Sequence, residues 1–315
     1  MVHRKTLFLF VISSLILIPI VVFTLAKITN PRDENPREAF KEVLAAIETE
    51  KENPIESIVE EELLNDGGDY GVVIKNLKTG ENFSLNENRE FQSASLYKLW
   101  IMGVAFQKIS DGQLSETEIL KGNLEDFDRI LSEATPTPSA TPSGETSDED
   151  KQEETKEISY SAQEAIEKMI TVSDNYAALL VASRAGSFAV TNFLKKYELK
   201  DSNFRQPPKT TAKDIALFFE KLYKGEIIDQ NYSNKMLGIL KRQTLNDRIP
   251  KYFPSKVNVS HKTGELNGFK HDAGIVYSSR GDYIIVVLSD TKDPAEASEK
   301  IANFSKDIFD YFTSL

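Results

Sequence analysis

Apolar residues recur with two different periods along this chain, and these periods separate strand-like ends from a helical middle. Residues 70–77 (YGVVIKNL) and 81–85 have the composition of strands. Further strands are predicted at 257–262, 273–277 and 283–289. Helical patterns cover residues 54–65, 95–109, 161–182, 187–197, 211–223, 231–242 and 294–312. We therefore predict an α+β fold, with an antiparallel sheet built from both ends of the chain, flanked by helices and joined to an all-helical lobe.

A long apolar run precedes this pattern. Leu7–Ala26 (LFLFVISSLILIPIVVFTLA) contains 20 uncharged residues, which as a helix would span roughly 30 Å, the thickness of a bilayer core. We expect residues 1–27 to form a single-pass transmembrane signal anchor, with a cleaved signal peptide as the alternative. The short N-terminal tail, with Arg4 and Lys5, favours a cytoplasmic N-terminus. Everything after residue 27 is then expected to be extracytoplasmic.

The rest of the chain divides into a spacer and one large domain. Residues 28–53 are interpreted as a linker and stalk helix, because 36–50 have an amphipathic pattern. Residues 54–315 are predicted to form the domain. Within it, 134–157 (ATPTPSATPSGETSDEDKQEETKE) contain alanine as their only apolar residue. Such a segment buries too little surface to offset its ordering entropy, so we predict a disordered insertion, with a functional tether as the alternative.

Composition excludes several function classes. The chain has 49 acidic and 38 basic residues, a net charge of −11, and a nucleic-acid binder needs a basic face instead. No cysteine is present, which excludes disulfides, thiolate metal sites and a cysteine nucleophile. The three histidines and the acidic residues form no metal-binding motif. His271 and Asp272 are neighbours on a predicted strand, so their side chains should point to opposite faces and not form a triad.

The tripeptide Lys-Thr-Gly occurs twice, and its two positions differ. Residues 78–80 lie between two predicted strands, where Gly80 supplies the positive φ of a hairpin turn. Residues 262–264 lie at the end of a predicted strand. A glycine on a strand, here Gly264, lets a ligand approach the backbone. We therefore interpret the first copy as a turn and treat the second as a candidate site.

Two further motifs precede the second copy. Ser95 and Lys98 form an S-x-x-K motif, and this spacing places both side chains on one face of a helix. A serine becomes nucleophilic when a base takes its proton, and a lysine can act as that base if burial or a nearby cation keeps it neutral. The apolar stretch after Lys98 suggests that this lysine is near the interior. The only S-D-N, at 173–175, lies between two apolar helical segments.

The order S-x-x-K, S-D-N, K-T-G is the motif set of class A β-lactamases and penicillin-binding proteins. In residues 54–315 the sequence resembles class A β-lactamase-like serine hydrolases. The resemblance extends to FQSASLYK at 91–98, MITVSDNYAALLV at 169–181 and KTGELNGFKHDAGIVY at 262–277. Alone, each motif is more often an ordinary cap or turn; together and in order they indicate this superfamily.

The resemblance implies a role for each motif residue. Ser95 would attack the amide carbonyl, Lys98 would accept its proton, and Ser173 would relay a proton to the leaving nitrogen. Asn175 would bind the substrate's side-chain amide, and Lys262 and Thr263 its carboxylate, with Lys262 also lowering the pKa of Lys98. The backbone N–H groups of Ser95 and Glu265, the residue after Gly264, would form the oxyanion hole. No cofactor is implied.

One feature of class A enzymes is absent from the sequence. Those enzymes carry a glutamate in an E-x-x-L-N stretch, on a loop after the S-D-N helices, which positions the water that cleaves the acyl-enzyme. Here residues 204–211 (FRQPPKTT) run directly into the next helix, and Glu198 lies too early to be the equivalent. The sequence therefore predicts acylation followed by slow deacylation.

Three functions remain open at this point. The first is a β-lactamase-like serine hydrolase acting on β-lactams or related cell-wall peptides, the second a D-alanyl-D-alanine carboxypeptidase or penicillin-binding protein. The third is a degenerate protein that binds β-lactams or peptidoglycan stem peptides with little or no turnover. The expected partners are these small substrates and, through the anchor, the membrane.

Overall fold

A five-stranded antiparallel sheet organises the part of the chain that the structure describes. That part of this computed structural model comprises residues 53–64, 67–134 and 156–314. The strand order is β2-β1-β9-β8-β7, with bounds β1 Asp69–Asn76, β2 Asn82–Leu85, β7 Asn258–Leu266, β8 Phe269–Tyr277 and β9 Tyr283–Asp290. The first two strands and the last three are far apart in sequence and join through β1 and β9. The predicted sheet built from both ends of the chain is therefore confirmed.

The sheet is covered on both faces, because successive side chains of β9 belong to two different apolar clusters. On β9, Tyr283, Ile285 and Val287 belong to one apolar cluster, which also contains residues of the flanking helices α3 (Pro54–Leu63) and α11 (Pro294–Ser314). The alternating residues Ile284, Val286 and Leu288 belong to a second, larger cluster. Because successive strand side chains point to opposite faces, a continuously apolar strand implies two covered faces.

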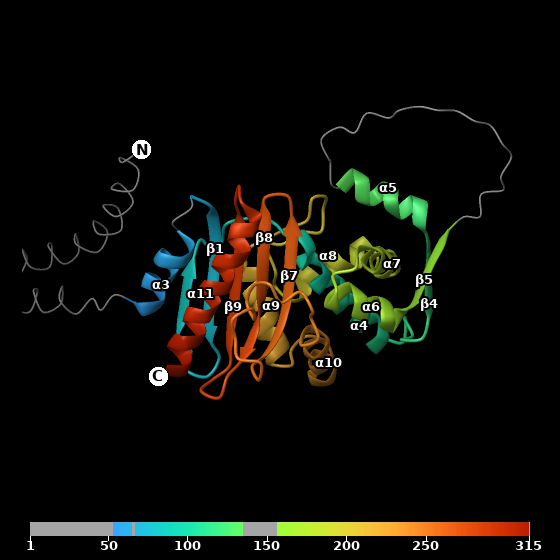
Figure 1. Ribbon diagram of the computed structural model, residues 1–315. Coiled ribbons are helices and arrows are strands. Elements are labelled where there is room, and N and C mark those ends of the chain that lie inside the picture. Colours follow the sequence, from blue (N-terminus) through green and yellow to red (C-terminus); the bar gives the residue numbers. More distant parts are fainter. Residues whose placement is uncertain (1–52, 65–66, 135–155, 315) are drawn as a thin grey trace, which may run out of the picture. The chain divides into compact units, whose positions relative to one another are not determined.

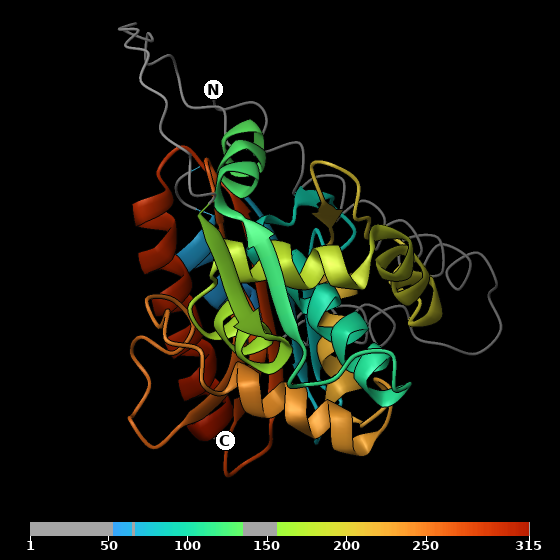
Figure 2. The ribbon, with the colours of Figure 1, turned by 90° about the vertical axis from the view of Figure 1, so that its right-hand side faces the viewer.

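The second cluster contains buried residues of the lobe helices and of the helix that covers this face of the sheet. Its helices are α4 Lys98–Ser110, α6 Ala162–Thr171, α7 Asn175–Ala185, α8 Ser187–Lys196, α9 Ala212–Tyr223 and α10 Gln230–Leu240. Figure 1 shows α11 in front of the sheet and α9 behind it, with α4, α6, α7 and α8 beyond the edge strand β7. Figure 2 views the same domain from the lobe side. The predicted helical lobe is thus present and meets the sheet at β7, but it is not all-helical, because two short strands, β4 (Ile119–Asn123) and β5 (Glu157–Ser161), contact α7 and α6.

Short elements that the sequence patterns did not indicate complete the fold. A two-stranded sheet pairs β4 (Ile119–Asn123) with β5 (Glu157–Ser161), and α5 (Leu124–Ala134) follows β4. Ala134 and Glu157, the ends of the predicted insertion, therefore lie in regular structure, while 135–155 lie outside the described residues. A second small sheet pairs β3 (Phe91–Gln92) with β6 (Lys209–Thr210).

The two Lys-Thr-Gly copies have different environments. The first forms the β1–β2 turn, where Asn76 Oδ1 accepts hydrogen bonds from the N–H groups of Lys78 and Thr79, and Gly80 has φ +79°. That prediction is confirmed. The second lies inside β7, which ends four residues later than predicted, so its placement at a strand end was wrong. Asn267-Gly268 makes the two-residue turn to β8, and this Asn-Gly pair was the signal that both strands extend further.

Membrane-related predictions fall largely outside the described residues. The predicted anchor Leu7–Ala26 and stalk helix 36–50 are among the residues that the structure does not describe. Within the described ranges no single helix is long and apolar enough to cross a membrane. Two consecutive helices, α7 and α8, are long and apolar enough when taken together, but the chain bends by 82° between them.

Helix packing in the lobe requires Gly103, which gives a stability prediction. A Cβ at Gly103 would lie 2.3 Å from the Phe193 ring of α8, which is much closer than the van der Waals contact distance between two carbons. Gly103→Ala should therefore destabilise the fold by about 1–3 kcal/mol through overpacking, measured by urea unfolding of the full-length protein. Gly238→Ala on α10 is the matched control, because its Cβ would meet only Arg242, at 3.8 Å; it should stabilise by about 0.5–1 kcal/mol. Equal effects would contradict this account.

Candidate active site

Ser95 lies on a 3₁₀ turn at the junction between the sheet and the lobe. The turn η1 (Ala94–Tyr97) packs against β7 and leads directly into α4. The sequence predicted one helix from Ser95 onward; the α-helix instead begins at Lys98. Ala94, just before the serine, has φ +43°, an uncommon conformation for a residue with a side chain. Strained backbone of this kind often occurs at functional sites.

Lys98 is fully buried and makes three close contacts. Its Nζ lies 2.6 Å from Ser173 O, 2.7 Å from Asn175 Oδ1 and 3.2 Å from Ser173 Oγ. Burial lowers the pKa of Lys98 to about 7, and the nearby Asp174 carboxylate partly opposes this shift. Burial disfavours the charged ammonium because it removes water. A large fraction of this lysine is therefore neutral near pH 7.

The S-D-N motif connects α6 to α7 and holds its three side chains in different roles. Ser173 has φ +56°, which directs both its carbonyl and its hydroxyl to buried lysines. Asp174 caps α7, accepting a hydrogen bond from Ala177 N at 2.9 Å. Asn175 is the first residue of α7, and its Oδ1 contacts Lys98. A turn between helices thus supplies the polar partners that a buried lysine requires.

Lys262 joins the same cluster from β7. It is fully buried, and its Nζ donates to Ser173 Oγ at 3.0 Å and to Thr263 O at 2.9 Å. Burial and then the charge of Lys98 lower the pKa of Lys262 well below its usual value. The sequence-based expectation was that burial and Lys262 together lower the pKa of Lys98. Burial does lower it, and the repulsion between the two amines disfavours two ammonium groups in the same cluster.

Gly264 allows β7 to approach the 3₁₀ turn. A Cβ at this position would lie 3.2 Å from Ser93 O and 3.1 Å from the His271 ring, tighter than ordinary van der Waals contact. The glycine was predicted to admit a ligand to the backbone. Its observed neighbours are parts of the protein, so at this position the absent side chain serves the packing that sets Ser95 against the strand.

A cavity of about 220 Å³ opens beside Ser95. Its lining includes Asn175 and Glu265 from the predicted site, with apolar side chains of α5 and α7 and residues 206–208 of the loop before β6. The buried side chains of Lys98, Lys262 and Thr263 do not line it. A substrate in this cavity would thus meet the serine directly, with the lysines behind it.

Glu265 and Arg248 form a charged pair at one end of the cavity. The Glu265 carboxylate is 2.6 Å from Lys270 Nζ and 2.8 Å from Arg248 Nη2. These two cations lower the pKa of Glu265 despite its partial burial. Arg248 is only 2% exposed and was not predicted to be near the site. Its position in an irregular loop before β7 carries no periodic signal, so only the tertiary structure could reveal it.

The two histidines that the structure describes, His261 and His271, serve the sheet and do not contact Ser95. His271 Nε2 hydrogen-bonds to Gln92 O at 2.8 Å, and its Nδ1 accepts from Ser289 N at 3.1 Å. Burial lowers the pKa of His271 to about 4, which keeps it neutral. Asp272 pairs with His261 on the neighbouring strand, at 2.9 Å. Among the described residues, no group of three or more His, Cys, Asp or Glu side chains could hold a metal ion.

The cluster has the chemistry of a serine acylation site. A neutral lysine amine has two N–H donors and one lone pair. Ser173 O and Asn175 Oδ1 can accept both N–H groups of Lys98, which leaves its lone pair for a hydroxyl proton. The competing acid–base group in the cavity is Tyr97, but burial raises the pKa of Tyr97 to about 12. Lys98 is therefore the better base near pH 7.

The unusual acidity of Lys98 can be measured without any substrate. In the full-length protein labelled with ¹³C-lysine, one Cε resonance, absent from Lys98→Gln, should titrate near pH 7. Asp174→Asn should lower that midpoint, because it removes the carboxylate that favours the ammonium while keeping an oxygen for the helix cap. A midpoint near the ordinary lysine value of about 10.4 would contradict the proposed burial effect.

Comparisons with known proteins agree with this geometry. The β-lactamase from Sphaerobacter thermophilus superposes with TM-score 0.69 at 20% identity, covering 83% of this chain and 98% of its own. The structure of PBP-A superposes with TM-score 0.69 at 23% identity, covering 84% and 97%. A class A β-lactamase from Bacteroides cellulosilyticus gives 0.66 at 19%, covering 83% and 98%. At these identities the similarities show the fold.

The family itself follows from the sequence comparison. No curated protein sequence matches significantly. The model of the β-lactamase enzyme family matches residues 53–312, from the start of α3 into α11. The predicted resemblance to β-lactamase-like serine hydrolases is thus confirmed. Because that match covers most of the chain, the protein belongs to the β-lactamase enzyme family.

Proposed function

We propose that this protein is a serine hydrolase that forms an acyl-enzyme with β-lactams or related cell-wall peptides. The observation that carries the proposal is the buried Lys98 amine, whose pKa is lowered to about 7 and which contacts Ser173 and Asn175 next to the Ser95 cavity. This is the arrangement that an activated serine requires, a nucleophile with a neutral base and a hydroxyl that can relay a proton.

The acylation step uses these groups in sequence. Ser95 Oγ attacks the carbonyl carbon of the substrate amide while its proton passes to Lys98 Nζ. The N–H groups of Ser95 and Glu265 are proposed to hold the resulting oxyanion, each such donor typically contributing about 3 kcal/mol. The C–N bond then breaks, and Ser173 Oγ, in contact with both lysines, delivers a proton to the leaving nitrogen. The product is an ester on Ser95 and an amine, which stays attached to the acyl group when the substrate is a β-lactam and departs when the substrate is a linear peptide.

The similar structures support the choice of substrate class. One of them, a mutant of PBP-A, is an acyl-enzyme complex with penicillin G, with TM-score 0.67 and 23% identity to this chain. For this chain we propose that Asn175 binds the substrate's side-chain amide and that Lys262 and Thr263 attract its carboxylate. The substrates proposed are thus β-lactams and peptidoglycan stem peptides.

We also propose an extracytoplasmic location, with the domain tethered by a single-pass anchor. The support is the uncharged run Leu7–Ala26 in the sequence. Peptidoglycan stem peptides lie outside the cytoplasmic membrane, so this location would place the site with the proposed substrate.

Slow deacylation is proposed because the cavity lacks a suitable base. Among the described residues that line it, Glu265 is the only carboxylate, and its pKa is lowered by the pairing with Lys270 and Arg248. A carboxylate so stabilised is a weak proton acceptor. Glu198 lies at the end of α8 and is not part of the lining. The proposed acyl-enzyme ester would therefore be hydrolysed slowly, because no efficient base activates the attacking water.

Covalent labelling tests both steps. Full-length protein mixed with penicillin G should gain the mass of one penicillin within minutes and keep it far longer, followed by intact-mass spectrometry. Ser95→Ala should remain folded and gain no mass. Rapid return of the wild-type protein to its free mass would refute slow release and favour an efficient β-lactamase.

The same experiment separates the alternatives. A wild-type protein that never labels would favour the non-catalytic binder. Release of D-alanine from a stem pentapeptide, with slow release of penicillin, would favour the D-alanyl-D-alanine carboxypeptidase, because both reactions share the acyl-enzyme and differ in how water reaches it.

A carboxylate placed on the loop should accelerate release. Gln206 lines the cavity with Ser95 but carries an amide, which is no base. Gln206→Glu should speed loss of the penicillin adduct by at least about tenfold, at the low end of what a positioned base gives in an evolved site. Gln206→Met, similar in size but without a base, should leave release slow. Equal rates in the two variants would show that water activation is not the limiting step.

A further inference from the structure

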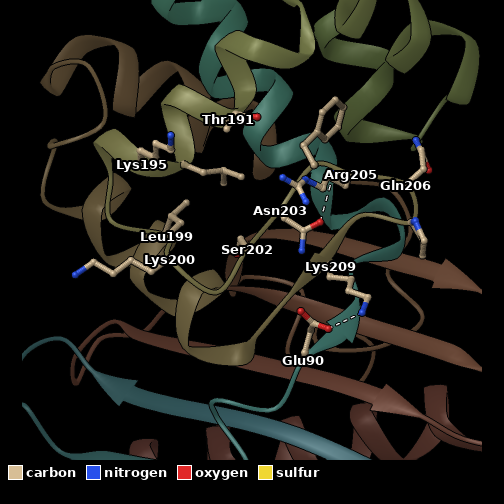
Figure 3. A pocket seen from close by; sticks show the side chains of 13 residues that line it. Glu90, Thr191, Lys195, Leu199, Lys200, Ser202, Asn203, Arg205, Gln206 and Lys209 are labelled. Atoms are coloured by element: carbon tan, nitrogen blue, oxygen red, sulfur yellow. Dashed lines mark hydrogen bonds and ion pairs between the residues drawn. The ribbon is translucent and has the colours of Figure 1, made fainter.

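A second, larger cavity adjoins the one that contains Ser95. Its volume is about 790 Å³, in the range of a ligand-binding cleft. Its walls come from α8 and from the loop between α8 and β6 (Figure 3). Gln206 and Pro207 line both cavities, so only this short piece of loop separates them.

The lining of the second cavity is basic although the protein is acidic. It contains Lys195, Lys200, Arg205 and Lys209 against the single acid Glu90, a balance of +3 in a chain of net charge −11. Lys209 is paired with Glu90 at 2.6 Å. The other three cations form no ion pair with any residue that the structure describes. A cleft with charge of one sign concentrates ligands of the opposite sign.

The unpaired cations are exposed, and apolar side chains lie beside them in the same cavity. Its lining also includes the apolar side chains of Leu194, Leu199 and Phe204. Figure 3 shows Arg205 among the lining side chains, with Lys195 and Lys200 on the side away from Gln206. Apolar walls with a few charged groups are typical of ligand sites. A ligand passing Gln206 would thus meet Arg205 first and the two lysines beyond it.

The direction of the second cavity identifies which part of a substrate would enter it. Under the proposed function, Asn175 binds the amide on the acyl side of the substrate. Asn175 and Gln206 line one cavity, and Gln206 continues into the next. The Lys262-Thr263 end, where the leaving-side carboxylate is proposed to bind, contributes to neither lining. The acyl arm therefore leads toward Arg205.

We propose that this second cavity is a subsite for a carboxylate carried on the acyl-side extension of the substrate. The inference rests on the proposed function, since it assigns the acyl arm from the role of Asn175. Arginine binds carboxylates through paired N–H donors, and Arg205 directly precedes Gln206, which lines both cavities. A peptide extends by up to about 3.5 Å per residue, so an acidic residue one or two positions before the reacting one would reach this region.

Two peptides that differ in one group provide the test. Both are stem pentapeptides with the same uncharged fluorophore, one with D-isoglutamate at its second position and the other with D-isoglutamine. Binding to full-length Ser95→Ala, which cannot be acylated, is followed by fluorescence anisotropy. We expect the carboxylate peptide to bind about three- to tenfold more tightly at low ionic strength, and this preference to shrink as salt screens the charges.

Variants locate the preference. Arg205→Gln, in the Ser95→Ala background, should reduce it to below about twofold, while an unchanged dissociation constant for the amide peptide would report that the fold is intact. Lys256→Gln is the matched control, because Lys256 is an exposed cation that lines neither cavity; it should leave the preference unchanged. Equal binding of the two peptides, or equal effects of the two variants, would overturn the subsite.

The proposed function is tested separately by penicillin labelling of the wild-type protein. A carboxylate preference without labelling would refute the serine hydrolase and keep the anionic subsite. Labelling without a carboxylate preference would keep the hydrolase and refute the subsite.

Discussion

The contact of two buried lysines with one serine hydroxyl is the interaction on which this site depends. Lys98 and Lys262 are both fully buried, and their Nζ atoms lie 3.2 and 3.0 Å from Ser173 Oγ. Two ammonium groups so close, and without water, repel each other strongly, and desolvation of each costs several kcal/mol. Loss of protons relieves both costs. The fold thereby converts two ordinary cations into weakly basic amines, one of which can take a proton from a neighbouring hydroxyl.

Packing at the sheet edge maintains this contact. Lys262 is held by β7, which is paired along its length with β8, while Lys98 begins the largely buried helix α4. The turn η1, which leads into α4, packs closely on β7 because Gly264 has no side chain to displace Ser93. Ser173, which has a positive φ, contacts both lysines from the helical lobe. The conformational cost at this residue is of order 1–3 kcal/mol, and the hydrogen bonds of the cluster offset it.

The loop between α8 and β6 contributes residues to both cavities. Because it is short, it leaves an open, basic cavity next to the serine, and it places the amide of Gln206 at the wall of the Ser95 cavity. Both features bear on the same reaction. The first would select the acyl arm of the substrate, and the second would leave the acyl-enzyme without a base for water.

Much of this could be predicted from local patterns. The strand-like composition of β1 and β9 and the helical periods of α4 and α8 indicated the layers, and the ordered motifs at Ser95, Ser173 and Lys262 indicated the family. Local patterns failed where tertiary contacts decide the structure. The 3₁₀ turn at Ser95 depends on packing against β7. The β4–β5 pair joins strands separated by a long polar segment, and short polar strands carry no clear period.

The sequence by itself determined the family, the sheet built from both chain ends and the candidate site residues, because these depend on residue type, order and spacing. Only the tertiary structure decided the protonation state of those groups, the presence of Arg248 beside Glu265 and the basic cavity beyond Gln206. Burial, charge repulsion and cavity shape are sums over residues that are distant in the chain, and no local pattern records them.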